Sequence, residues 1–415
     1  MLTRSFRAAP IPRGGCLSGA RVEYELRTWN SVRAIGEATL ATLSSSDTSP
    51  FLSFAWLDAL EQTGCVAETK GWSPLHLTLH RDGQLVAFAP AYLKSNSEGE
   101  FVFDHAFARF AEGSLGIDYY PKLIVAVPFT PATGTRILVR AGEAREQLLG
   151  AFASGLRKVA AELGLSSAHV LFPLAEEAQL LVRHGLAQRI GVQFQWHNPG
   201  YASFDDFLAR FNAKRRHQIR RERREVLAQD VEIEVLTGSD LSPELADFVF
   251  SFYRSTVDKF FWGRRYLNRA FFEEVLSRMR DRVHIVAAKD KNSGRRIAGA
   301  FNLLGENTLY GRYWGALEER NFLHFEVCFY SGIEEAIRRK LIRFEPGAGG
   351  EHKLARGFEP TETTSVHHLA DARFDRAVRD FLERETSALR EQIQNAKDEA
   401  GLKALSALDT TSRPE

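Results

Sequence analysis

Residues 283–304 read VHIVAAKDKNSGRRIAGAFNLL, which is the pattern of a β-hairpin: an apolar run, a polar turn with glycine, and a second apolar run. We expect strands over 283–288 and 296–304, joined by a turn at 292–295. The stretch PLHLTLHRDGQLVAFAPAYL at 74–93 repeats this form around an Asp-Gly turn. An aromatic-rich helical pattern precedes each hairpin. The alternatives are a weak internal duplication and a coincidence of two unrelated hairpins, and the hairpins alone do not decide between them.

The length of 415 residues predicts two domains, which we place at 22–195 and 196–385. Residues 1–21 are expected to be a disordered tail, and 386–415 a charged tail that is part helix and part disordered. The N-terminal tail contains arginines but not the apolar segment of a secretory signal. An organellar targeting peptide and a misassigned start both stay open for it.

Charge and cysteine content exclude several classes of protein. The net charge of +1 provides no overall basic field, so a DNA-binding protein is not expected. The cysteines Cys16, Cys65 and Cys328 are far apart and lack metal-ligand spacing, so neither a disulfide framework nor a metal site is indicated. No apolar stretch approaches the length of about 18 residues that a membrane-spanning helix needs. We therefore predict a cytoplasmic protein without a transmembrane segment.

Six short motifs carry a resemblance to a known family. They are Phe103–His105, Tyr119–Leu123, Val127–Gly134, Thr308–Gly315, Leu323–Glu326 and Gly350–Lys353. These motifs resemble an uncharacterised Fem-like family of the GNAT acyltransferase superfamily and, more distantly, the Fem peptidoglycan transferases. The resemblance implies tandem GNAT-like (acyl-CoA N-acyltransferase-type) α/β domains with mixed central sheets. It also implies transfer of an acyl or aminoacyl group, from aminoacyl-tRNA or acyl-CoA, to the amine of a small molecule or cell-wall precursor.

The sequence departs from the Fem pattern. The run from Lys353 to Phe358 is similar to the Fem element Phe-Lys-x-x-Phe-Gly, but His352 replaces the first Phe, the spacing from the lysine to the second Phe is longer, and Glu359 replaces the final glycine. No coiled-coil arm for tRNA accompanies the single long helix that we expect over 204–226. The usual pyrophosphate loop for coenzyme A is also not evident. The resemblance therefore leaves the donor open between aminoacyl-tRNA and acyl-CoA.

The glycine-rich segment 345–353 is the predicted catalytic site. Its glycines allow a ligand to approach the backbone closely, and charged side chains follow at once. The resemblance implies that Lys353 stabilises the developing oxyanion or a phosphate. Glu351 or His352 is a candidate acceptor of the amine proton, and Asp104 is a further candidate for proton handling. The alternative is an ordinary charged surface loop.

A second set of side chains is predicted to bind the substrate. It consists of His105, Tyr119, Tyr120, Lys122, Arg216, Arg220, Arg312, Trp314, His324 and Glu326. Strand alternation would place Tyr310, Arg312 and Trp314 on one face, where they suit a phosphate or carboxylate. The basic run at 214–224 suits a diphosphate, a tRNA backbone or a membrane surface. Structural roles are the alternatives: a stacked arginine, a solvated basic helix face and, for Glu326, an acid near a helix N-terminus.

Two other functions stay open besides Fem-like transfer. A coenzyme A-dependent N-acetyltransferase would have a pair of parallel strands that splay apart, with free backbone N–H groups above a helix N-terminus. A non-catalytic protein would bind a cell-wall or lipid precursor. Catalysis predicts that Lys353, Arg312 and Asp104 surround one pocket, whereas separate locations would favour the binding protein.

Overall fold

The computed structural model divides into two compact units. The residues that it describes are 5–7, 23–45, 48–259 and 264–400. Unit 1 comprises 1–191 and 362–389, and unit 2 comprises 192–361 and 390–415. Residues 362–385 thus lie in unit 1 and not in the second domain predicted above. The reason is that β16 (Glu359–Leu369) pairs antiparallel with β9 (Ser167–Leu171) of unit 1.

The predicted tails fall only partly within the described residues. β1 (Ser5–Arg7) pairs with β2 (Glu25–Trp29), which corrects the expectation that 1–21 has no regular structure. The remainder of that tail lies outside the described residues. Residues 386–400 continue α13 (Ala372–Ala400), and 401–415 again lie outside the described residues.

Unit 1 contains strands with the orders β1-β2-β4-β5-β8 and β3-β6-β7-β9-β16. The bounds not yet given are β3 (Trp72–Pro74), β4 (His76–Arg81), β5 (Gln84–Ala89), β6 (Ala91–Lys94), β7 (Lys122–Val125) and β8 (Leu138–Val139). The predicted hairpin is confirmed around Asp82 and Gly83. Its return strand is nevertheless divided at Pro90, so that β5 pairs in one set and β6 in the other. Proline has no N–H to donate to a strand ladder, which explains the break.

The helices of unit 1 cover its sheets and bury a continuous apolar core. They are α1 (Val32–Ile35), α2 (Glu37–Ala41), α3 (Phe54–Gln62), α4 (His105–Phe110), α5 (Arg145–Glu162), α6 (Ala175–Arg183) and the first part of α13. α5 connects β7 to β9, which pair in parallel, and buries Leu148, Phe152 and Leu156. None of the helices in the described part of the chain has the length and apolar character needed to cross a membrane.

In unit 2 the strand order is β11-β12-β13-β14-β15-β10. The bounds are β10 (Ala187–His197), β11 (Val231–Thr237), β12 (Val283–Asp290), β13 (Arg296–Leu304), β14 (Thr308–Ala316) and β15 (Arg343–Glu345). The second predicted hairpin, β12–β13, is confirmed. β14 and β15 pair in parallel, whereas β11–β12, β12–β13, β13–β14 and β10–β15 pair antiparallel.

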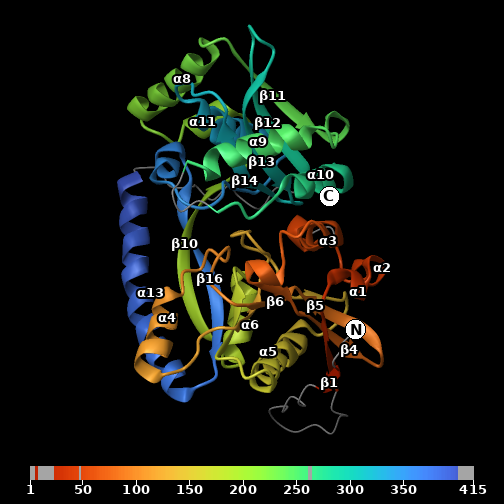
Figure 1. The fold of residues 1–415 in the computed structure, drawn as a ribbon. Helices are drawn as coiled ribbons and strands as arrows, with labels where there is room; N and C mark the ends of the chain where they lie inside the picture. The colour runs from red at the N-terminus through yellow and green to blue at the C-terminus, as the bar shows by residue number, and fades with distance from the viewer. Residues whose placement is uncertain (1–4, 8–22, 46–47, 260–263, 401–415) are drawn as a thin grey trace, which may run out of the picture. The chain divides into compact units, whose positions relative to one another are not determined.

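The helices of unit 2 lie over this sheet, with α9 in contact with β13 and β14 (Figure 1). They are α7 (Phe204–Leu208), α8 (Ala213–Leu227), α9 (Leu245–Val257), α10 (Arg269–Arg278), α11 (Leu323–Phe325) and α12 (Ser331–Arg338), with a π-helical turn at Glu326–Tyr330. The single helix predicted over 204–226 is wrong. The chain breaks after α7, and the Asn212 side chain accepts a hydrogen bond from the Arg215 N–H to cap α8. Gly315 allows α9 to approach closely, since a Cβ there would lie 1.8 Å from the Phe252 carbonyl oxygen.

The two units repeat one strand order. In unit 2 a hairpin leads to β14, β14 pairs in parallel with β15, and β10 pairs antiparallel with β15. In unit 1 the hairpin 72–94 leads to β7, β7 pairs in parallel with β9, and β16 pairs antiparallel with β9. A helical connection lies between the two parallel strands in each unit. The repeat thus extends beyond the two hairpins visible in the sequence.

Candidate active site

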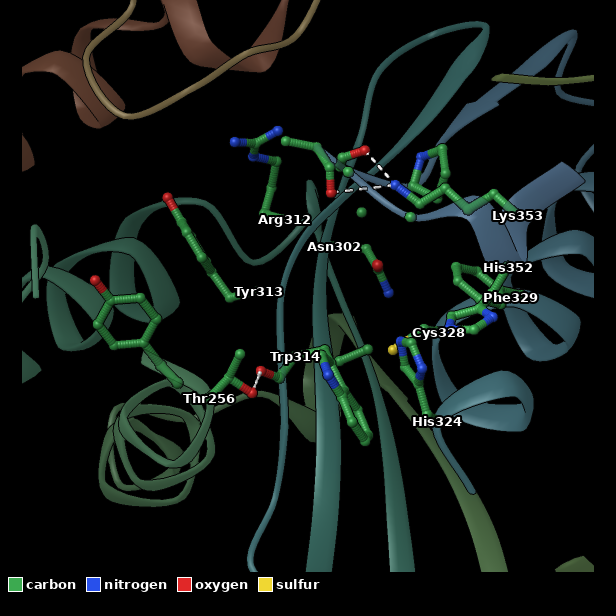
Figure 2. A pocket seen from close by; sticks show the side chains of 18 of the residues that line it. Thr256, Asn302, Arg312, Tyr313, Trp314, His324, Cys328, Phe329, His352 and Lys353 are labelled. Carbon is green, nitrogen blue, oxygen red and sulfur yellow. Dashed lines mark hydrogen bonds between the residues drawn. The ribbon is translucent and has the colours of Figure 1, made fainter. Parts of the chain in front are cut away.

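A cavity of about 320 Å³ lies in unit 2, beside β14. Its lining comes from α9, β13, β14, the helical segment after Leu323 and the loop Pro346–Lys353. Figure 2 shows Tyr313 and Lys353 on opposite sides of the cavity, with Trp314 next to His324. The structure therefore brings together segments that are up to about 100 residues apart in the chain.

A β-bulge on β14 turns three consecutive side chains toward the cavity. Asn302 pairs with Gly311 and Phe301 pairs with Tyr313, so Arg312 is an extra residue on its strand. Arg312, Tyr313 and Trp314 all line the cavity. The predicted alternation, which put Tyr310 on the same face, is wrong because the bulge shifts the register by one residue.

The cavity opens where two parallel strands separate. β14 pairs with β15 only over 308–310, and β14 then continues to Ala316 while β15 ends at Glu345. The chain after β15 turns away through Gly347, whose φ of 87° favours glycine. Gly311 permits this turn to pass close by, since a Cβ there would lie 3.1 Å from the Pro346 Cα. This separation is the splayed arrangement that the coenzyme A alternative predicted.

Lys353 reaches the cavity from the end of the glycine-rich loop. Its side-chain Nζ donates hydrogen bonds to the Gly347 carbonyl at 2.6 Å and to the Ala348 carbonyl at 3.3 Å. The residue is only 4% exposed. Burial, with a smaller contribution from the neighbouring Arg312 charge, lowers the pKa of Lys353 from 10.5 to about 8. Both hydrogen-bond partners are neutral carbonyls, so the ammonium charge is not cancelled by an acid.

The other titratable side chains leave the cavity without negative charge. Burial lowers the pKa of His324 to about 4, with Arg356 as the next contribution, so this imidazole is neutral near pH 7. The His324 ring lies 4.5 Å from the Trp314 ring, centroid to centroid. The lining residues, all of them in the described part of the chain, include no Asp or Glu. Because Arg312 and Lys353 supply the charge, the cavity electrostatically favours an anionic or oxyanion-forming ligand.

The predicted residues of the first half lie in unit 1 and do not line this cavity. Lys122 is buried there and donates to Ser97 Oγ at 2.9 Å, to Glu100 Oε2 at 2.8 Å, and to Asp104 Oδ2. The Tyr119 hydroxyl donates to the same Asp104 oxygen at 2.6 Å. Burial alone would raise the pKa of Asp104, but the Lys122 ammonium holds it well below its usual range. Asp104 is therefore a poor proton acceptor, contrary to the role predicted for it. It also does not line the cavity with Lys353 and Arg312, so the expectation that these three residues surround one pocket is not met, and on this point the binding protein is favoured.

Of the two remaining predicted residues of unit 1, Tyr120 contacts this buried ionic cluster and His105 does not. The Tyr120 hydroxyl shares a hydrogen bond of 2.7 Å with Ser97 Oγ. His105 is exposed at the start of α4. The structure thus joins Tyr119, Tyr120 and Lys122 in one cluster but leaves His105 outside it.

The remaining predicted residues of unit 2 occupy different positions. Glu326 is buried and accepts hydrogen bonds from Arg223 at 2.9 and 3.0 Å, away from the cavity lining. Arg216 donates to the Phe211 carbonyl at 2.5 Å, and Arg220 pairs with Asp205 at 2.7 Å. His352 is exposed and lines the cavity. The side chain of Glu351 lies outside what the structure describes.

Sequence reasoning missed several side chains of the cavity. Thr256 lines it and donates to the Trp314 carbonyl at 2.6 Å, which ties α9 to β14. Cys328, for which no sequence pattern indicated a place at a site, is half-buried and also lines the cavity. Tyr313 stands inside the motif Thr308–Gly315, but only the bulge directs it to the cavity. No signal in the sequence separates Thr256 from the other polar residues of α9.

Comparisons with known proteins agree with this architecture. The repeated sheet order defines a mixed α/β chain. The model of the FemAB-like family, described as peptidoglycan biosynthesis and recognition, matches residues 25–404. The chain belongs to this family, and the predicted Fem-like fold class of tandem GNAT-like domains is confirmed.

Among solved structures, FemX is 11% identical, with 80% of this chain and 94% of that chain covered and a TM-score of 0.49. A tandem GNAT protein from the clavulanic acid biosynthesis pathway is 12% identical. The match covers 84% of this chain and 99% of that chain, with a TM-score of 0.41. L-PGS from Bacillus licheniformis is 10% identical, with 75% and 90% covered and a TM-score of 0.46. No curated protein sequence matches this chain.

Proposed function

We propose that this chain is a cytoplasmic transferase that moves an aminoacyl or acyl group to an amine, with the cavity of unit 2 as its reaction site. The observation that carries the proposal is the placement of buried Lys353 and Arg312 in a cavity whose described lining side chains include no acid. Family membership supports a transferase, and its description supports a peptidoglycan precursor as the acceptor. The candidate donors are aminoacyl-tRNA and acyl-CoA.

The proposed step is attack of an amine on the donor carbonyl. A nitrogen–carbon bond forms, and the carbonyl becomes a tetrahedral oxyanion that Lys353 stabilises by charge. The carbon–oxygen bond of an aminoacyl ester, or the carbon–sulfur bond of a thioester, then breaks. The amine proton passes through His352 to the leaving oxygen or sulfur. Arg312 holds a phosphate or carboxylate of the ligand beside the reacting carbonyl.

Coenzyme A-dependent N-acetylation is the second candidate, because one observation favours it. The separation of β14 from β15 after residue 310 is the arrangement expected for an acyl-CoA donor. Against it, the loop between Ala316 and Leu323 contains no glycine that would let a pyrophosphate approach the backbone.

Donor binding tests the proposal directly. Calorimetric titration of the full chain with aminoacyl-tRNA and with acetyl-CoA is expected to give binding of one donor. Uncharged tRNA and free coenzyme A serve as controls for recognition of the acyl group. Transfer to a peptidoglycan precursor amine is then followed by mass spectrometry. If neither donor binds, both transferase functions are excluded and a precursor-binding protein is left.

The pH dependence of transfer tests the role of Lys353. A lysine is charged below its pKa, and the pKa of Lys353 is about 8, so its positive charge is lost as the pH rises through 8. We expect kcat/KM to fall above about pH 8, long before an ordinary lysine with a pKa of 10.5 would titrate. In Lys353→Arg the charge persists, so this decline should disappear even if the activity is lower. A wild-type profile that stays level beyond pH 9 would contradict the assigned role.

A further inference from the structure

A second cavity of unit 2 lies between α8, β11 and the helical segment that contains α12. This α8–β11 groove measures about 710 Å³ and shares no lining residue with the cavity that contains Lys353. None of the residues assigned to the proposed transfer reaction lines this groove. Both α8 and β11 are labelled in Figure 1.

The outer surface of α8 is strongly basic. The helix contains seven Lys and Arg residues and two Glu residues. Of these acids, Glu222 is buried, where it accepts hydrogen bonds from Arg356 and Tyr330. Glu225 pairs with Arg221 at 3.1 Å. The helix therefore presents a surplus of positive charge to solvent.

Inside the groove, four arginines differ in how their charge is neutralised. Arg223 is held by Glu326 and Glu334, and Arg338 by Glu335. The remaining two, Arg220 and Arg224, are exposed.

Arg220 and Arg224 are the cations available to a ligand. Arg220 pairs only with Asp205, whose side chain is 76% exposed, and an ion pair this exposed contributes little. Arg224 has no ion-pair partner among the described residues. The spacing of four residues places Arg220 and Arg224 on the same face of α8, at the groove.

The wall next to these arginines is apolar. Leu227 continues the same helix face and is 57% exposed, and Val235 on β11 is 45% exposed. Ile233 and the buried Leu208 extend this surface. An apolar strip that begins at an arginine pair matches a ligand with an anionic head and a hydrocarbon chain.

The groove is poorly suited to nucleic acid. Binding of single-stranded nucleic acid without sequence preference uses exposed aromatic faces on which bases stack. Phe204 is the one aromatic side chain in the lining, and the Arg223 guanidinium lies 4.6 Å from its ring centroid. A base would have to displace an arginine that two carboxylates hold in place.

We propose that the α8–β11 groove binds an anionic phospholipid of a membrane surface, with the headgroup phosphate at Arg220 and Arg224 and an acyl chain along Leu227, Ile233 and Val235. The proposal goes beyond the transfer reaction, since it concerns where unit 2 is held and not what it catalyses. A phospholipid satisfies both halves of the groove, whereas a free phosphate leaves the exposed apolar half in water.

Flotation of the full chain with vesicles tests the proposal. We expect binding to vesicles of phosphatidylcholine containing about one third phosphatidylglycerol, and binding about tenfold weaker to phosphatidylcholine alone. Arg224→Gln should weaken binding about fivefold. The matched control is Arg221→Gln, which removes the same charge from the same helix but lies outside the groove lining, and it should have less than about half that effect. Leu227→Ser should weaken binding even at high salt, where charge effects are screened.

Several outcomes would overturn the proposal. Absence of binding to the anionic vesicles does so at once. Equal losses in Arg221→Gln and Arg224→Gln would indicate a diffuse basic surface instead of a groove. Release by millimolar inorganic phosphate, or binding of short RNA without any effect of Leu227→Ser, would assign the surface to another anion. Thermal unfolding and donor binding of the variants should match wild type, which separates this result from failure of the proposed transfer.

Discussion

Replacing Lys353 with methionine should lower the turnover of acyl transfer by about a hundredfold to a thousandfold, the usual cost of removing one group that stabilises an oxyanion. Methionine retains most of the side-chain volume and removes only the charge. The ammonium contacts two neutral carbonyls and no acid, so its loss leaves no buried charge unpaired. We therefore expect the thermal unfolding temperature to change little. Transfer of a labelled aminoacyl or acetyl group to an amine, measured at saturating donor, checks this result.

The matched control for this variant is Lys291→Met. Lys291 is an exposed lysine of the same unit and does not line the cavity. It should retain wild-type turnover. If Lys353→Met also retains full turnover, Lys353 is not part of the reaction site, and the proposed function loses its central residue. Donor binding without measurable turnover in the wild-type chain would instead favour a binding protein.

Replacing Lys122 with methionine should destabilise unit 1 by about 3–5 kcal/mol, the usual cost of breaking a buried ion pair from one side. Lys122 is fully buried between Glu100 and Asp104, whose side chains are 2% and 4% exposed. Burial alone would lower the pKa of Lys122, but these two carboxylates raise it above its ordinary value. Removing the ammonium leaves two carboxylates without the charge that stabilises them. Urea unfolding followed by circular dichroism measures the difference.

Two further variants separate charge from packing at this cluster. Lys158→Met removes a lysine that pairs with Glu162 at 3.9 Å on the surface of unit 1, and it should change the free energy of unfolding by less than about 1 kcal/mol. Adding Glu100→Gln and Asp104→Asn to Lys122→Met should restore part of the lost stability, because no buried charge is then unpaired. A Lys122→Met protein as stable as Lys158→Met would show that the cluster does not stabilise the fold.

Much of the fold was accessible from the sequence, because hairpins and amphipathic helices leave periodic patterns. The prediction failed where a single residue interrupts a pattern. Asn212 caps a new helix inside an apparently continuous one, and Pro90 divides one return strand. Arg312 is an extra residue in its strand, and no proline or glycine stands at position 312 to signal this bulge. Asn212 and Pro90 act locally, whereas the bulge at Arg312 depends on pairing with a neighbouring strand, which the sequence of one segment does not encode.

The candidate site shows the same division between local and tertiary information. By itself, the sequence determined that the late glycine-rich loop ends in a lysine and that an arginine and a tryptophan stand close together upstream. Only the tertiary structure decided that Lys353 and Arg312 line one cavity whose described lining side chains include no acid, and that Asp104 instead neutralises Lys122. The physical reason is that charge and pKa depend on burial and on neighbours that are distant in the chain. Those neighbours are set when strands pair and helices cover them.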